Sequence, residues 1–166
     1  MANVATATVI TPQDLLIHWQ GHRNLTRKVI EAFPETDLFN FSVGGMRPFS
    51  LLTLEMIDLS LYGMKGVTTG KWIGVNEMQH SSGNNPLSTK AELLELWDTV
   101  TENINATWHL IRPEQFQETM LSFNAYEGTV IDIILYWIDN EIHHRGQGYV
   151  YLRALGIEPP FFWDRP

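Results

Sequence analysis

Residues 140–149 read NEIHHRGQGY, and they put polar side chains on a helix face that is otherwise made of core residues. Apolar residues recur at steps of three and four around this stretch, which predicts a helix over residues 128–155 with Gly156 as its C-terminal stop. Asn140 and His144 are four residues apart, the spacing at which helical metal ligands meet at one point. They share a face with Ile133, Trp137, Gly148 and Tyr151. The pattern leaves two interpretations open, a metal ligand at His144 or a core histidine with a local hydrogen bond.

Two glycines interrupt the same helix. Gly146 and Gly148 each cost about 1 kcal/mol relative to alanine in a helix interior. We therefore expect a second backbone or a ligand to lie close to this part of the helix.

Three further long helices are predicted upstream. The first begins at Thr11, a favoured N-cap residue, and ends before Pro34. The second covers residues 48–66 and is apolar on nearly every side, which is typical of a helix buried within a bundle. The third begins with the capping-box pattern at Thr89 and ends before Pro113.

The connections carry weaker signals. Residues 34–47 are predicted as a loop, and residues 67–88 as a connection with a short helix near 72–78. Residues 114–126 fit either irregular chain or a short hairpin. Because few segments alternate with a period of two, the predicted fold class is all-α, a four-helix bundle forming one domain over residues 1–166. Its core should include Trp19, Trp97, Trp108 and Trp137.

Composition narrows the function classes. The 166 residues include 11 Lys and Arg, 19 Asp and Glu and no cysteine, which gives a net charge of −8. An acidic chain repels phosphate backbones, so nucleic acid is not an expected partner, and disulfides and thiolate zinc sites are excluded. No signal peptide or membrane-spanning run is visible, so we expect a cytoplasmic protein without a membrane partner.

Glu55 and Asp58 are the only acidic residues of the apolar second helix. A buried carboxylate is costly unless a donor or a cation compensates it. For Glu55, that partner could be His144, Arg145 or a divalent ion. The five donors of Arg145 fit either an ion pair or a clamp for an anionic group of a substrate or cofactor.

Four other histidines complete the candidates. His18 and His22 are four residues apart on the apolar stripe of the first helix, which favours partly buried histidines with local hydrogen bonds. His22 would enter the cavity of Glu55 if the first helix flanks the second. His80 and His109 have no partners by spacing and are interpreted as surface or packing residues.

The sequence resembles the DinB/YfiT-like superfamily. The resemblance is most specific at residues 141–147, 151–153 and 155–160, and residues 45–49, which lead into the second helix, also match. It implies an up-down-down-up bundle, often homodimeric, with nickel or zinc held by three histidines, one from the second helix and two from the last. Glu55 and Asn140 stand where two of those histidines are expected, and His144 matches the third, with His143 beside it.

Members of this superfamily resemble metal-dependent hydrolases and transferases of low-molecular-weight thiols. The first hypothesis is thus an enzyme in which Glu55, Asn140 and His144, or His22 in place of Asn140, hold nickel, zinc or manganese. That metal would activate a water or thiol against a small-molecule substrate, with Arg145 holding an anionic group of the substrate. The sequence identifies no catalytic residue beyond these ligands.

The alternative hypothesis is a non-catalytic bundle that has lost the metal and serves as a ligand-binding, structural or stress-related dimer. Glu55 would then pair with His144 inside the bundle. In either case the apolar segment at residues 159–163 is expected to cover a neighbouring subunit or the end of its own bundle.

Overall fold

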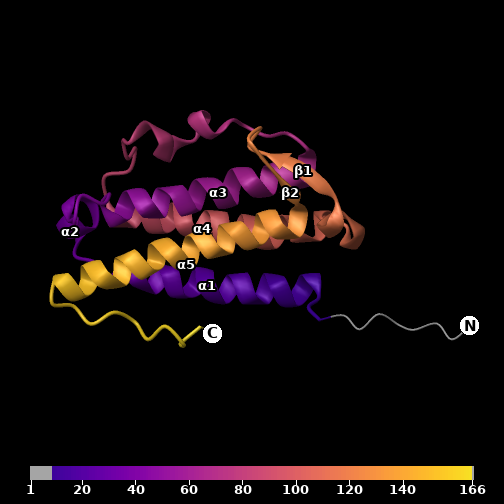
Figure 1. The fold of residues 1–166 in the computed structure, drawn as a ribbon. Helices are drawn as coiled ribbons and strands as arrows, with labels where there is room; N and C mark the ends of the chain where they lie inside the picture. The colour runs from indigo at the N-terminus through magenta and orange to yellow at the C-terminus, as the bar shows by residue number, and fades with distance from the viewer. Residues whose placement is uncertain (1–8, 166) are drawn as a thin grey trace, which may run out of the picture.

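The computed structural model describes residues 9–165, and its four long helices run up, down, down and up (Figure 1). The segment between the second and third of these helices crosses back along the bundle, so those two helices run in the same direction (Figure 1). The predicted all-α bundle is confirmed. The long helices are α1 (Pro12–Ala32), α3 (Phe49–Thr69), α4 (Lys90–Thr107) and α5 (Val130–Ala154). Both α1 and α3 pack against α4 and α5.

Local sequence explains where these helices begin. The backbone N–H of Asp14 donates to the Thr11 side chain at 3.1 Å, and the Asp14 carboxylate accepts from the Thr11 backbone at 3.1 Å. Thr89 and Glu92 form the same reciprocal pair at the start of α4. Each box satisfies backbone donors that the first turn leaves free, so the predicted helix starts are confirmed to within a residue or two.

The short elements differ more from expectation. The prediction of a loop after Pro34 was wrong, because α2 (Glu35–Asn40) follows directly. Its six residues bury only Leu38, which is too little to produce a helical period. The helix predicted near 72–78 is reduced to a single 3₁₀ turn. The 3₁₀ turns are η1 (Val75–Glu77), η2 (Gln79–Ser82), η3 (Trp108–Leu110) and η4 (Pro113–Gln117).

Of the two structures expected for residues 114–126, irregular chain or a short hairpin, the structure contains the hairpin. Strands β1 (Thr119–Ser122) and β2 (Tyr126–Thr129) pair antiparallel, with Thr119 opposite Thr129 and Ser122 opposite Tyr126. At its tip, Phe123 adopts a φ of 52°, which is uncommon for a residue with a side chain. Its buried ring lies 5.2 Å from the Trp72 ring and 6.4 Å from the Trp137 ring, so packing fixes this conformation.

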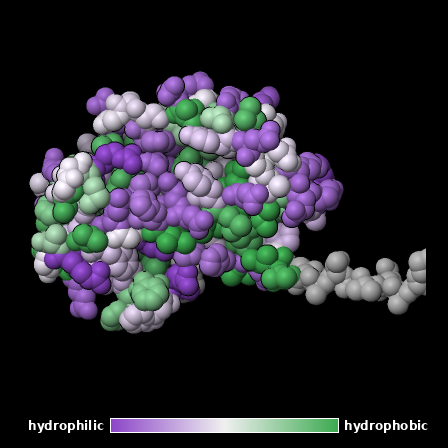
Figure 2. Space-filling model, viewed as in Figure 1, coloured by the Kyte–Doolittle hydropathy of each residue, from purple (hydrophilic) through white to green (hydrophobic). Residues whose placement is uncertain are grey.

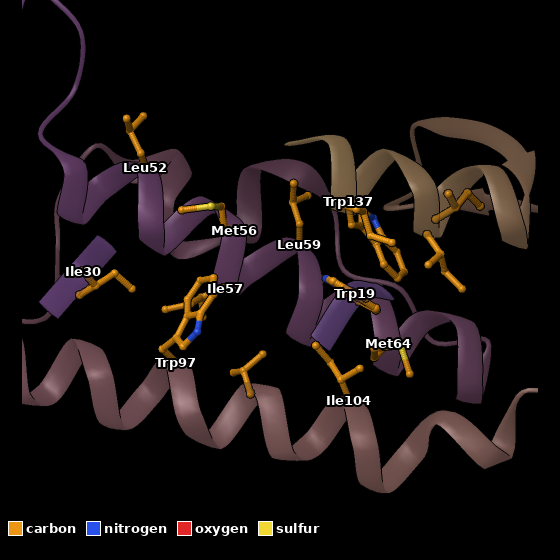
Figure 3. Packing of buried hydrophobic residues seen from close by; sticks show 14 of the residues in the cluster. Trp19, Ile30, Leu52, Met56, Ile57, Leu59, Met64, Trp97, Ile104 and Trp137 are labelled. Atoms are coloured by element: carbon orange, nitrogen blue, oxygen red, sulfur yellow. The ribbon is translucent and has the colours of Figure 1, made fainter. Parts of the chain in front are cut away.

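The core lies between the four long helices. Figure 3 shows Ile57 and Met64 of α3 above Trp97 and Ile104 of α4. The rings of Trp19 and Trp137 lie 6.1 Å apart. All four tryptophans predicted for the core, Trp19, Trp97, Trp108 and Trp137, are buried, which confirms their assignment.

The outer surface is mostly hydrophilic in the view of Figure 2, with green patches over part of α5 and near the start of α1. After α5 the chain turns back alongside α1, where Lys28 pairs with Asp164 at 2.8 Å. The rings of Phe161, Phe162 and Trp163 remain more than half exposed. Within residues 9–165, no helix combines the length and the apolar character needed to cross a bilayer.

The two glycines of α5 have different surroundings. A Cβ atom on Gly148 would lie 2.5 Å from the ring of Phe49, which stacks on Phe33. A Cβ atom on Gly146 would meet nothing within 4 Å. The expected close approach is therefore present at Gly148, where the neighbour is a ring of α3. At Gly146, no atom of residues 9–165 makes such an approach.

This contrast predicts opposite effects of one substitution. Gly148→Ala should destabilise the protein by about 1–3 kcal/mol, because the methyl group forces the stacked Phe49 ring to move. Gly146→Ala should leave stability unchanged or raise it by about 0.5–1 kcal/mol, because alanine restricts the unfolded chain. Urea unfolding of both variants measures the difference, and equal effects would contradict this packing.

Candidate functional site

Glu55 lies in the second turn of α3 and faces α5. One carboxylate oxygen, Oε1, accepts hydrogen bonds from Asn140 Nδ2 and from His144 Nε2, each at 3.0 Å. The other oxygen, Oε2, accepts from Arg47 Nη2 at 2.6 Å. The structure thus brings together Glu55, Asn140 and His144, the three residues named from the sequence, and adds Arg47 from the loop before α3.

The ring of His144 is oriented from its other side. Gln147 Oε1 lies 2.7 Å from His144 Nδ1, so Nδ1 carries a proton and donates to it. The contact of Nε2 with the Glu55 carboxylate also requires a proton, because two acceptors would repel each other. A ring that donates from both nitrogens is cationic, so this geometry is that of an ion pair between His144 and Glu55.

Burial and hydrogen bonding act in opposite directions on Glu55. Its side chain is 17% exposed, and desolvation alone would raise its pKa. Hydrogen bonds from His144, Asn140 and Arg47 outweigh that effect and hold the pKa of Glu55 well below its ordinary value. The carboxyl group is therefore an anion at neutral pH.

The side-chain amide of Asn140 has a hydrogen-bond partner for its nitrogen but none for its oxygen within residues 9–165. Its amide nitrogen faces the carboxylate of Glu55, so the carbonyl oxygen Oδ1 points away from it. Oδ1 is buried and has no hydrogen-bond partner within residues 9–165. Leaving a buried acceptor unpaired costs about 1–3 kcal/mol, which makes this atom a contact point for a donor that comes from outside the protein.

These donors do not fit a three-ligand metal centre. Glu55 and His144 are competent ligands, but Asn140 offers a neutral amide, which is poor for nickel and zinc. The guanidinium of Arg47 already occupies one oxygen of Glu55, and its charge opposes a divalent cation. The part of the chain that the structure describes contains no group of three or more His, Cys, Asp or Glu arranged for a metal ion. No chemical step is therefore derived through a metal, and the expected divalent ion and thiol stay predictions.

Arg145 points to the opposite side of α5. Its guanidinium donates to Thr26 Oγ1 at 3.1 Å and approaches His22 Nδ1 at 2.9 Å, both on α1. It also lies 3.8 Å from Glu141, whose buried carboxylate accepts from Thr26 at 2.6 Å. These contacts occupy Arg145 in the α1–α5 interface, on the side away from Glu55, and its role as a cofactor clamp stays a prediction.

The other histidines lie outside the Glu55 cluster, and His22, His80 and His143 each have contacts of their own. His22 contacts His18, Arg145 and Arg165 and takes no part in the Glu55 cluster. His143 is exposed, with its ring 5.0 Å from that of His144. His80 does have a partner, which spacing did not indicate. Its Nδ1 lies 2.8 Å from Oδ2 of Asp58, 22 residues earlier in the chain.

A cavity of about 420 Å³ adjoins this cluster. It lies among α3, α5, the hairpin and the 3₁₀ turns, and Glu55 forms part of its wall. The other lining residues are mainly apolar and aromatic, a lining typical of small-molecule sites. They are Leu59, Val75, Met78, His80, Ser122, Phe123, Tyr126, Glu127, Gly128, Asp132, Ile133, Tyr136 and Trp137.

Comparisons with known proteins agree with this architecture. The model of the DinB family matches residues 1–164. The chain belongs to the DinB family. A DinB-like protein of Bacillus subtilis superposes with a TM-score of 0.69 at 20% identity, covering 92% of this chain and 99% of that one. A DinB-like protein of Bacillus cereus gives a TM-score of 0.69 at 16% identity, covering 91% and 97%.

At these identities the two DinB-like structures show the fold alone. A search of curated proteins finds no match. Membership of the DinB family therefore establishes the bundle and its connectivity, while the homodimer, the cytoplasmic location and the activity expected from the sequence stay predictions.

The buried His22 predicts a pH dependence of stability. Burial, followed by the charges of Arg145, His18 and Arg165, lowers the pKa of His22 to about 3. Because the unfolded chain binds a proton there near pH 6.5 and the folded protein does not, stability should fall as the pH drops below that value. The slope contributed by one such group is at most about 1.4 kcal/mol per pH unit.

Urea unfolding between pH 6.5 and 5 tests this, since most carboxyl groups remain ionised there. His22→Gln should flatten the profile, whereas the matched control His109→Gln, on an exposed residue, should keep the wild-type slope. Identical profiles for wild type and His22→Gln would show that His22 is protonated in the folded protein.

Proposed function

We propose that this DinB-family protein binds a small molecule in the cavity beside Glu55, and that an ion cluster of Arg47, Glu55 and His144 replaces a metal centre. The observation that supports this most is the bonding of Glu55. Both of its oxygens already accept from protein donors, at 2.6 Å from Arg47 and 3.0 Å from His144 and Asn140. No further cation is needed to stabilise the charge.

The cluster is suited to a structural and binding role. Two positive groups flank one carboxylate, and the His144 side chain is only 8% exposed. Removal of one partner of such a buried pair leaves an uncompensated charge, which is strongly destabilising. The cluster therefore fixes α5 against α3 and the loop before it, beside the cavity that Glu55 helps to line.

One observation favours the competing prediction of a metal-dependent hydrolase or thiol transferase. Asn140 Oδ1 is buried and unpaired, on a side chain whose amide nitrogen contacts Glu55, so a rotated amide could offer this oxygen as a weak third ligand. In our proposal this atom instead accepts a hydrogen bond from water or from the bound molecule.

Elemental analysis and unfolding of the same samples separate the two functions. Tag-free protein supplied with nickel, zinc and manganese should retain well under one equivalent of any of them. Glu55→Gln should lower stability by about 1–3 kcal/mol without changing metal content, because the amide cannot accept from all three donors.

The matched control is Glu95→Gln, on an exposed face of α4, which should change stability by less than about 0.5 kcal/mol. One equivalent of bound metal in the wild type, lost in Glu55→Gln, would contradict the proposal and support the metal enzyme.

A further inference from the structure

Asp58 presents a second buried carboxylate one turn after Glu55. It is 1% exposed within the apolar helix α3, and the two hydrogen bonds found for it within residues 9–165 both involve His80. Oδ2 accepts from the backbone N–H of His80 at 2.8 Å and lies 2.8 Å from His80 Nδ1. A buried carboxylate held in this way fixes the histidine ring in one orientation and one tautomer.

In the tautomer with the proton on Nδ1, the Asp58–His80 pair presents an acceptor at the cavity. Because Nδ1–H donates to Asp58, the neutral ring of His80 carries its lone pair on Nε2. His80 lines the cavity, and no hydrogen bond to its Nε2 is found within residues 9–165. Asp58 behind the ring would stabilise positive charge that approaches Nε2, as the carboxylate of a catalytic triad does for its histidine.

Several of the side chains that line the cavity are aromatic. Phe123 at the hairpin tip, Tyr126 on β2, and Tyr136 and Trp137 on α5 all line it. The faces of such rings attract ammonium groups within about 6 Å of the ring centre. At about 420 Å³ the cavity has room for a ring and a short chain.

The charged residues that line the cavity favour a cationic ligand. Glu55, Glu127 and Asp132 line the cavity, and none of its described lining residues is Lys or Arg. Arg47 and His144 balance Glu55, whereas Glu127 and Asp132 are exposed, with no ion pair found for either within the described residues. Their negative potential would attract a cation and repel a carboxylate or phosphate.

We propose that the cavity binds a small primary amine as its ammonium ion. The ammonium group donates to His80 Nε2, and the apolar part of the ligand packs against Tyr136 and Trp137. This inference rests on the proposed function, that the cavity binds a small molecule, and adds the chemical class of that molecule. In the simplest competing account, the Asp58–His80 pair only fastens the η2 turn to α3.

Three probes of matched shape test the charge preference at pH 7. They are 2-phenylethylamine, which is cationic, 2-phenylethanol, which is neutral, and 3-phenylpropionate, which is anionic. Titration calorimetry should show the amine binding at least about tenfold more tightly than the alcohol, with the propionate weakest.

Two variants locate the binding. His80→Gln retains a donor for Asp58 but removes the Nε2 acceptor, and Tyr136→Leu removes an exposed ring while keeping apolar contact. Each should reduce the affinity for the amine at least about fivefold. The control His109→Gln changes an exposed residue that does not line the cavity, and it should leave the affinity unchanged. Tyr136→Leu keeps the test decisive if His80→Gln does not fold.

The outcomes separate the two claims. If the alcohol or the propionate binds as tightly as the amine, the preference for an amine is wrong while small-molecule binding stands. If the amine binds best but His80→Gln and Tyr136→Leu have no effect, the assigned site is wrong. If none of the three probes binds at millimolar concentration, both the inference and the proposed function fail.

Discussion

A carboxylate that is mostly removed from water must be compensated, and the arrangement around Glu55 follows from that constraint. Its two oxygens collect donors from three places in the chain, which are Arg47 before α3, and Asn140 and His144 on α5. The same bonds hold the two helices that border the cavity. Substitution at Glu55 therefore affects stability and the shape of the binding site together.

Successive residues on one helix serve different interfaces. His144 bonds to Glu55 on α3, whereas the next residue, Arg145, bonds to His22 and Thr26 on α1. A rotation of about 100° per residue explains this division, because neighbours in sequence face different partners. Residues 140–149 thus anchor α5 on two sides, and only one of those sides reaches the cavity.

Local signals in the sequence were sufficient to predict the helical bundle. Thr11, Thr89 and the prolines after α1 and η3 define helix ends through interactions within a few residues, and the four core tryptophans follow the helical period.

The partnership of Glu55, Asn140 and His144 could be proposed because a buried acid needs a donor. Asp58 needed one for the same reason, but its partner, His80, lies in an irregular segment where no period indicates which residue faces the helix. The short helix α2 was missed because a single buried leucine produces no pattern.

The central claim is that protein donors, and no metal ion, compensate Glu55. The ¹⁵N spectrum of the His144 imidazole at pH 7, assigned by comparison with His144→Gln, tests it most directly. Our account predicts that both ring nitrogens carry protons and that one equivalent of zinc leaves their signals unchanged. An unprotonated Nε2 whose signal shifts on stoichiometric addition of zinc would show a metal ligand and contradict the account.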